Sequence, residues 1–321
     1  MSDSQILKKV LFIGAGGNIG GPIFSSLENA GFDLTVLSRP NSTNKFGPNV
    51  KVVKKEYDDP SLHEVFEGQD AVVSFVSVTA LLDQLKLIDI AVKAGVKRFI
   101  PSELGSNTLN PKAQELVLFY KQKRTVLNHL EAAAKDNPSF SWTGLATGPV
   151  FDWQISTFGS TSSHGHQGLK NSFLGFDLKA HTALIYDDGD IRSSYSNLAT
   201  IGQAVVAVLR EPVQTANMYL YISSFTVSQN EILASLEKAT ATKWTVNKGS
   251  TVDREKEGKV KLANGDFSGV LLLLARLMYG GDAGTNFEEE RTLANKLLGL
   301  PQESLDATVQ AVVDGQNRET G

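Results

Sequence analysis

Three glycines near the start of the chain have the spacing of a phosphate-binding loop. Gly14, Gly17 and Gly20 lie between a short apolar run and an amphipathic segment, and Asn18 and Ile19 separate the last two glycines. The spacing is GxxGxxG, because Ile19 stands where a strict GxGxxG pattern has its last glycine. Glycines permit a tight turn and let the backbone approach a pyrophosphate, whose charge faces the N-terminus of the following helix. These five residues are therefore predicted to bind the diphosphate of a dinucleotide.

The segment after the second expected strand indicates which dinucleotide binds. An acidic residue here would bind the ribose 2′-hydroxyl of NAD, but the sequence has Arg39, followed by small hydroxyl residues and by Lys45. An arginine and hydroxyl donors suit a 2′-phosphate. The sequence therefore predicts NADPH as the cofactor, with Arg39 and Lys45 among its ligands. The alternative is that Arg39 is an ordinary solvated side chain.

A lysine completes the apolar stripe of a helix expected over Lys112–Lys135. The apolar members of this stripe are Leu116, Tyr120, Leu127, Leu130 and Ala134. Lys123 fills the seven-residue gap in the stripe and so faces inward. A buried lysine is costly unless it is paired or functional, and desolvation lowers its pKa toward the range of acid–base catalysis. Lys123 is therefore the predicted catalytic residue, and an ion pair with a carboxylate such as Glu103 is an equal alternative. Lys121 lies roughly 200° round the helix, so the two lysines cannot both face inward.

Other common catalytic patterns are absent from the sequence. No tyrosine has a lysine four residues later, and Tyr120 is followed at that spacing by Arg124. The chain contains no cysteine, which excludes disulfides, thiolate catalysis and cysteine-ligated zinc. The histidines do not have the spacing of metal ligands, so no metal site is expected.

Composition limits the partners of this chain. The formal net charge of −4 over 321 residues gives no indication of a nucleic-acid partner. The most apolar run, from Val270 to Met278, is too short to span a bilayer, and the polar first residues do not have the pattern of a secretory signal peptide. A cytoplasmic protein without membrane contact is therefore expected.

The elements that must position these residues alternate between strands and helices. Strands are expected at Val10–Ile13, Leu34–Leu37, Val50–Val53, Ala71–Val76, Arg98–Ile100 and Ser141–Leu145, with helices at Ile19–Ala30, Leu81–Ala94 and Lys112–Lys135. This alternation predicts an α/β fold with a doubly wound parallel Rossmann sheet.

The second half is expected to form a smaller, helix-rich C-terminal substrate lobe. Its expected helices are Leu198–Leu209, Gln229–Ala239, Asp253–Leu262, Phe267–Tyr279 and Phe287–Leu297, with one strand at Met218–Ile222. The predicted division is a dinucleotide domain over residues 1–152 and a substrate lobe over residues 153–321, partly interleaved with the sheet. The apolar segment Leu271–Met278 is expected to line or cover the substrate pocket, because ligand pockets are mostly apolar.

Several segments together resemble the isoflavone reductase-like and NmrA-like family of atypical short-chain reductases. The matching pieces are Gly14–Gly20, Arg39, Phe99–Gly105, the helix with Lys123, and Thr147–Trp153. The resemblance implies NADPH-dependent reduction of a small organic substrate, aromatic or apolar, in secondary metabolism. The bond reduced would be an activated C=C, a benzylic C–O, an imine or a carbonyl. A homodimer is a possible assembly.

The resemblance also implies the residues of the site. Lys123 would act there as general acid or base. The residues that would surround the cofactor are Val76, Ser77, Ser102, Glu103, Lys123, Pro149, Val150 and Phe151. The family also contains regulators that bind a dinucleotide without catalysis, and those of the NADPH-sensing type lack this lysine. Lys123 therefore favours an enzyme, and a non-catalytic NADP(H)-sensing regulator of the NmrA type is the alternative.

Overall fold

The computed structural model describes residues 7–156 and 173–320. A seven-stranded sheet with the order β10-β6-β5-β4-β1-β2-β3 forms the centre of the first lobe, and every neighbouring pair in it is parallel. Its strands are β1 (Lys9–Ile13), β2 (Asp33–Ser38), β3 (Lys51–Lys54), β4 (Ala71–Ser74), β5 (Arg98–Ile100), β6 (Ser141–Ala146) and β10 (Met218–Tyr221). The strand order reverses direction between β1 and β4, which is the doubly wound arrangement. The predicted fold class is confirmed.

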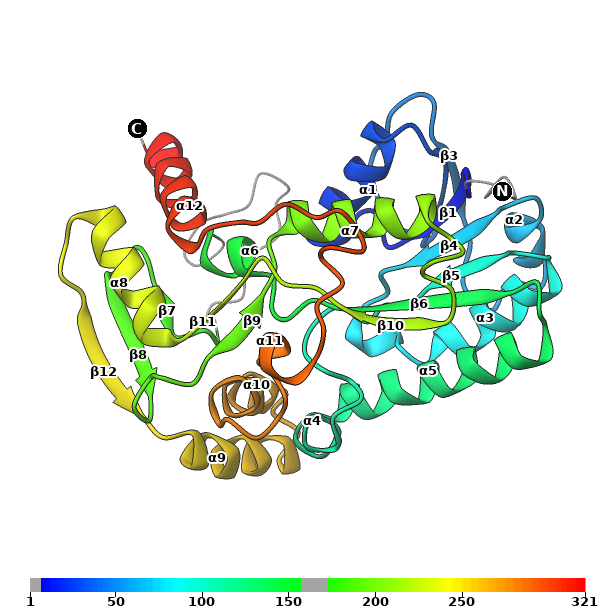
Figure 1. Cartoon of the computed structure of the whole chain (residues 1–321). Coiled ribbons are helices and arrows are strands. Elements are labelled where there is room, and N and C mark those ends of the chain that lie inside the picture. Colours follow the sequence, from blue (N-terminus) through cyan, green and yellow to red (C-terminus); the bar gives the residue numbers. More distant parts are fainter. Residues whose placement is uncertain (1–6, 157–172, 321) are drawn as a thin grey trace.

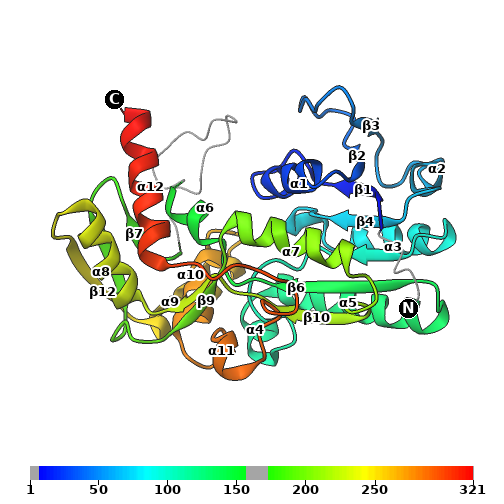
Figure 2. The same cartoon turned by 45° about the horizontal axis from the view of Figure 1, so that its top comes forward.

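Helices cover both faces of this sheet, which explains why β1 and β4 bury apolar residues on both faces. Val10 and Phe12 of β1 pack into a core with α1 (Gly20–Asn29) and α7 (Leu198–Arg210). Leu11 and Ile13 point to the other face and pack against α3 (Asp83–Lys93) and α5 (Leu118–Asp136). Figures 1 and 2 show α1 and α7 together over one face, while α3 and α5 lie on the other. Two short helical elements complete this lobe: α2 (His63–Phe66) lies between β3 and β4 in the chain, and η1 (Val78–Ala80) follows β4.

The second lobe combines helices with two small sheets. Its three-stranded sheet has the order β12-β8-β7, and β9 pairs with β11. Its elements are α4 (Pro111–Leu116), α6 (Phe151–Ser156), β7 (Phe176–Asp177), β8 (Thr182–Tyr186), β9 (Ser193–Tyr195), β11 (Phe225–Val227), α8 (Gln229–Thr240), β12 (Thr245–Gly249), α9 (Thr251–Ala263), α10 (Gly269–Tyr279), α11 (Phe287–Glu290) and α12 (Leu305–Thr320). The expected helices that correspond to α7, α8, α9 and α10 are present, but both small sheets, α6 and α12 were not predicted. Short strands between helices carry too few residues to show a clear period of two.

Two expected helices differ from the structure. The single helix over Lys112–Lys135 is wrong, because Val117 is extended (φ −131°, ψ 113°) and separates α4 from α5. Val117 is buried in the core of the second lobe, so tertiary packing interrupts a segment that has no glycine or proline. The helix over Phe287–Leu297 is also wrong, since α11 ends at Glu290. The following segment instead runs beside β10, where the Ala294 N–H donates to the Tyr221 carbonyl over 2.7 Å.

The two halves of the chain are interleaved in the sheet. The outer strand β10 comes from beyond residue 152 and pairs with β6, and α7 packs against α1. The boundary itself, at residue 152, stays a prediction. Within residues 7–156 and 173–320, no helix is both long and apolar enough to cross a bilayer.

A buried arginine on β5 joins β6 to the loop before β10. Arg98, with 1% of its surface exposed, donates to the hydroxyls of Ser141, Thr143 and Thr215 over 2.8 to 2.9 Å and also to the Pro212 carbonyl. Burial lowers the pKa of Arg98 to about 10, so the guanidinium is still charged at neutral pH. No ion pair joins Arg98 to a carboxylate in the described part of the chain.

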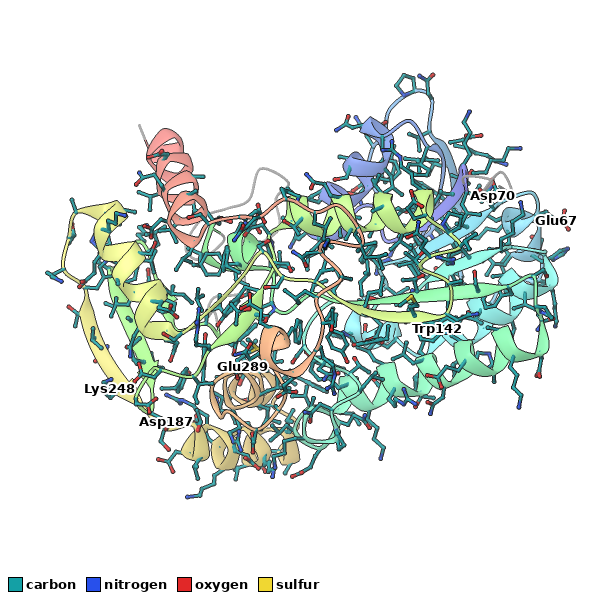
Figure 3. All side chains as sticks on the ribbon, viewed as in Figure 1. Glu67, Asp70, Trp142, Asp187, Lys248 and Glu289 are labelled. Carbon is teal, nitrogen blue, oxygen red and sulfur yellow. The ribbon has the colours of Figure 1, made fainter. Side chains whose placement is uncertain are left out.

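The carboxyl ends of the parallel strands face the second lobe. At the opposite edge, Asp70 accepts hydrogen bonds from the N–H groups of Lys8 and Lys9 and pairs with Lys97. Figure 3 shows Asp70 at one end of the molecule and Asp187 of the second lobe at the other. The loops that follow β1, β4, β5 and β6 therefore meet at the junction of the two lobes, where doubly wound folds bind their ligands.

Candidate active site

The glycine loop after β1 packs tightly against the end of β4. Gly14 has φ +89°, and a Cβ at this position would lie 2.2 Å from the Phe75 carbonyl oxygen. A Cβ on Gly20 would lie 2.1 Å from the Gly14 carbonyl oxygen. Both positions therefore require glycine for steric reasons. Gly17 differs, because it is exposed and a Cβ there would make only ordinary contacts, 3.4 Å from the Gly14 carbonyl oxygen, so its backbone is accessible to a ligand.

The N-terminus of α1 has the chemistry of an anion site. The helix begins at Gly20, one residue later than expected, with Ile19 as its N-cap. No side chain caps this end, and the first turn carries no acidic residue. Its partial positive charge is therefore directed at the loop formed by Gly14 to Ile19, including half-buried Asn18.

The segment after β2 reaches the same loop. The Asn44 side-chain amide lies 3.5 Å from the Gly16 carbonyl oxygen, and a Cβ on Gly16 would lie 1.7 Å from that amide nitrogen. Arg39 and Lys45 are exposed on this segment. Arg39 is close enough to Tyr57 for its charge to act on the pKa of the phenol, although burial raises that pKa overall. Asn44 was not predicted from the sequence, although a glycine such as Gly16 is typical of a place where another segment approaches closely.

A serine connects the ends of β4 and β5. The Ser102 hydroxyl donates to the Val76 carbonyl over 3.1 Å, and the Ser102 N–H donates to the Gln84 side chain over 2.9 Å. Val76 is buried, whereas Ser77 is exposed and its hydroxyl contacts that of Thr79. The structure therefore brings Val76, Ser77 and Ser102 to the same edge, beside the glycine loop that packs on Phe75.

The amine of Lys123 lies at this edge. Lys123 is 4% exposed, and its Nζ donates to the backbone carbonyls of Glu103 (3.2 Å) and Leu104 (2.6 Å), just after β5. The rings of Phe119 and Tyr120 lie 5.5 and 5.1 Å from the amine. Burial lowers the pKa of Lys123, and the negative charge of Glu103 opposes part of that shift. The prediction that Lys123 belongs to the buried stripe of the helix is confirmed.

The neighbouring lysine has a different environment. Lys121 is exposed on α5, whereas Tyr120, Lys123, Leu127 and Leu130 are buried. Only Lys123 can therefore act in a desolvated position. A close glycine contributes to the space around its amine, because Gly105 has φ +124° and a Cβ there would lie 2.9 Å from the Tyr120 hydroxyl and 3.8 Å from the Lys123 amine.

The carboxylate of Glu103 points away from the open edge. Glu103 is 1% exposed, and its Oε2 accepts hydrogen bonds from the hydroxyls of Thr108 (2.6 Å) and Tyr219 (3.2 Å). Burial raises the pKa of this carboxyl, while Lys123, Thr108 and Tyr219 oppose the shift. The alternative of an ion pair between Lys123 and Glu103 is wrong, because the amine bonds backbone carbonyls and the carboxylate oxygen Oε2 bonds Thr108 and Tyr219 instead. Thr108, on a loop, and Tyr219, on β10, were not predicted from the sequence.

The segment after β6 ties the site to the second lobe. The Ser196 N–H donates to the Pro149 carbonyl over 3.2 Å, and the Phe151 N–H donates back to the Ser196 carbonyl over 2.9 Å. Val150 lies between them and forms a bridge with Ser196. The Phe151 ring is fully buried, edge-on to Tyr195 and Phe225. Contact of Pro149, Val150 and Phe151 with a cofactor stays a prediction.

No cluster of three or more histidine, cysteine, aspartate or glutamate side chains that could hold a metal ion occurs in residues 7–156 and 173–320. The site is therefore described by its glycine loop, its exposed cations and the buried lysine with its carboxylate.

Comparison with known proteins identifies the family. The model of the NmrA-like family matches residues 7–256. The oxidoreductase aprR of Aspergillus flavus is 37% identical over 96% of this chain and 99% of its own length, and the oxidoreductase poxI of Penicillium oxalicum is 31% identical over 93% of this chain and 92% of its own length. The leucoanthocyanidin reductase of Vitis vinifera, solved as a binary complex with NADPH, shares the fold with a TM-score of 0.70 and 18% identity, covering 95% of this chain and 99% of that one. The chain belongs to the NmrA-like family, as its glycine loop, its Phe99–Gly105 segment and its buried lysine predicted.

Proposed function

We propose that this protein is an NADPH-dependent reductase of a small organic substrate. The observation that carries the proposal is the amine of Lys123, which is buried at the carboxyl edge of the sheet beside the loops that would hold a dinucleotide. Relatives that match almost the whole chain are named oxidoreductases, and a structural neighbour was solved with NADPH. A role in secondary metabolism is the biological setting that we propose.

The bonding of Lys123 suits both directions of proton transfer. Two of the tetrahedral positions on Nζ are directed to the carbonyls of Glu103 and Leu104. An ammonium ion in this geometry keeps one N–H for a substrate, and a neutral amine keeps its lone pair. The same lysine can therefore donate a proton as a general acid or accept one as a general base.

The cofactor residues divide into three groups along the edge. Gly14, Gly17, Asn18, Ile19 and Gly20 would hold the diphosphate, Arg39 and Lys45 the 2′-phosphate, and Val76, Ser77, Ser102, Pro149, Val150 and Phe151 the nicotinamide half. NADPH, when bound, supplies the hydride. Reduction then consumes one substrate, one NADPH and one proton, and Lys123 delivers that proton to the atom that gains the electron pair. Glu103 contributes through Lys123, because its carboxylate faces Thr108 and Tyr219.

The second lobe would supply the substrate pocket. The side chains of α10 that point inward, among them Leu273, Leu277 and Tyr279, are buried in the same core as α4, which precedes the lysine helix. An apolar or aromatic substrate fits such surroundings. The candidate bonds are an activated C=C, a benzylic C–O, an imine or a carbonyl, and a homodimer is the assembly that we propose.

A non-catalytic NADP(H)-sensing regulator is the less favoured function. A sensor needs the glycine loop and the arginine but has no use for a desolvated lysine, whose burial is costly. The deciding experiment is a screen for NADPH oxidation against compounds that carry each of the four candidate bonds. Substrate-dependent loss of NADPH absorbance would support a reductase. Tight NADPH binding without turnover of any class would favour the sensor.

Arg39 is expected to determine the choice of cofactor. Replacing Arg39 with alanine should weaken NADPH binding by roughly ten- to a hundredfold, because a charge-assisted contact with the 2′-phosphate is lost. NADH affinity should change little. Arg210→Ala is the matched control, since Arg210 is exposed at the end of α7 beside the amino edge of the sheet. Calorimetric titration of all three proteins with both cofactors measures the effect, and equal affinity of the unaltered protein for NADPH and NADH would contradict the assignment.

A further inference from the structure

The side chain of Glu103 reaches across β6 to a tyrosine that comes from the second half of the chain. We propose that Glu103, held in place by Thr108 and Tyr219, is a positioning residue that sets how tightly Lys123 holds its proton. Only the catalytic use of that proton rests on the proposed function. The link between the two side chains is a property of the folded protein and can be measured without a substrate.

A glycine in β6 makes the contact between Glu103 and Tyr219 sterically feasible. β6 lies between β5 and β10, and Gly144 of β6 pairs in register with Tyr219. A Cβ on Gly144 would lie 2.8 Å from Cδ2 of the Tyr219 ring and 3.5 Å from Cγ of Glu103. Any other residue at position 144 would therefore occupy the space in which the two side chains meet. An isolated glycine inside a buried strand is the pattern typical of such a close approach.

The hydrogen bonds fix which way each donor points. The Thr108 N–H donates to the Tyr219 hydroxyl over 3.1 Å, so the hydroxyl proton of Tyr219 is free to point at Oε2 of Glu103, 3.2 Å away. The Thr108 hydroxyl donates to the same oxygen over 2.6 Å. Two donors on one oxygen favour the carboxylate over the protonated acid. The other oxygen, Oε1, is buried without a hydrogen-bond partner in the described part of the chain. The Lys123 amine lies 3.2 Å from the backbone carbonyl oxygen of the same residue, which places it close enough for the charge of Glu103 to act on it.

Charged and titratable groups around the pair come from three places. Among the described residues, Glu103 is the charged group that raises the pKa of Lys123. The charges of Lys123 and Arg124 on α5 lower the pKa of the Glu103 carboxyl. The charge of Glu103 in turn raises the pKa of the phenols of Tyr219 and Tyr221 on β10. The Tyr120 hydroxyl accepts from the Ser106 N–H over 2.9 Å, and the charge of Glu103 also raises the pKa of this phenol. Farther out, Glu290 and Arg291 act on Tyr221.

The charge of each buried group shifts the pKa of the other in the direction opposite to the shift caused by burial. Burial alone lowers the pKa of Lys123 and raises the pKa of Glu103. Each charge opposes the shift of the other, so the Glu103 carboxylate raises the proton affinity of an amine that burial lowers. The sign for substitution follows directly. Removing the negative charge of Glu103 must lower the pKa of Lys123 further.

The test is a titration of the Lys123 amine by NMR in protein labelled with carbon-13 at the lysine ε-position. The Lys123 signal is identified by its loss in Lys123→Met. In Glu103→Gln, which keeps the shape of the side chain, we expect the midpoint of this titration to fall by at least about one pH unit. In Tyr219→Phe, which removes one donor from the carboxylate, we expect a smaller fall in the same direction. Glu115→Gln, an exposed carboxylate change on α4, is the matched control and should leave the midpoint unchanged.

The outcomes separate this inference from the proposed function. A midpoint in Glu103→Gln that stays within about 0.3 pH units of the unaltered protein, or moves upward, would overturn the role of Glu103. If a substrate is known, the limb of the kcat/KM pH profile that belongs to Lys123 should move with the NMR midpoint. A clear NMR shift together with full activity of Lys123→Met would support the link between Glu103 and Lys123 and overturn the catalytic assignment of the lysine. Heat denaturation of Glu103→Gln checks that the variant is folded before it is titrated.

Discussion

Replacement of Lys123 with methionine is expected to lower kcat by ~10²–10⁴, because general acid–base catalysis contributes about this much. The change removes the amine and keeps an unbranched side chain of similar length in a position that is 4% exposed. NADPH affinity should stay within a few-fold, since Nζ is directed to backbone carbonyls and to the proposed substrate position. Steady-state turnover and calorimetric NADPH titration on the same preparation measure the two quantities.

The neighbouring lysine provides the control for this substitution. Lys121→Met alters an exposed side chain on the same helix and should change kcat by less than about twofold, as for most surface substitutions. A stable Lys123→Met protein with normal NADPH binding and full turnover would refute the assignment. If Lys123 served only as the partner of Glu103, its loss would strand a buried carboxylate and lower the free energy of unfolding by about 3–5 kcal/mol. Thermal melts of the variant distinguish that structural effect from a purely catalytic one.

Replacement of Arg98 with methionine is expected to have the largest effect on stability. The substitution removes hydrogen bonds from one charged group to Ser141 and Thr143 of β6 and to Thr215 and the Pro212 carbonyl in the loop before β10. Each hydrogen bond to a charged group contributes about 1.5–3 kcal/mol to stability. Part of this loss is offset, because the variant no longer bears the cost of burying a charge. A net loss of about 3–5 kcal/mol is therefore expected, which lowers the melting temperature by at least ~6 °C.

The residue before Arg98 gives a matched comparison. The Lys97 side chain is 46% exposed and pairs with Asp70 over 3.0 Å. Lys97→Met should cost no more than about 1 kcal/mol, because exposed ion pairs contribute little. Urea denaturation of both variants gives the two free energies. Equal stability of Arg98→Met and the unaltered protein would show that the buried guanidinium is dispensable for holding the outer strands together.

The parts of the fold that the sequence predicted have strong local patterns. β1 and β4 carry the short apolar runs Val10–Ile13 and Ala71–Val73, followed by Gly14 and Ser74, and the expected strand Arg98–Ile100 agrees with β5. The stripe with Lys123 has a period that only a helix satisfies, so the lysine could be placed on the buried face without a structure. The glycine loop could be recognised from spacing alone, because close contacts with Phe75 and within the loop require glycine at positions 14 and 20.

The parts that were missed depend on contacts between distant segments. Tyr219 has no neighbour in sequence that indicates a partner for a buried glutamate, because 116 residues separate it from Glu103. The break at Val117 and the end of α11 at Glu290 arise from packing against the second lobe and against β10, and no proline or glycine marks either position. Gly144 was a usable signal, since a glycine inside a buried strand indicates a close neighbour, but it does not say which one.

The place of β10 in the sheet has a consequence for how the protein is made. Until residues 218–221 leave the ribosome, β6 has an open outer edge, although the rest of the dinucleotide fold has already been synthesised. Such an edge can pair with strands of other nascent chains. The chain must therefore delay the closing of its first lobe until more than two thirds of it has been translated, and a fragment that stops at residue 152 lacks both the β10 strand and the phenol that meets Glu103. Vectorial synthesis thus completes the sheet and the surroundings of the lysine in a single late step.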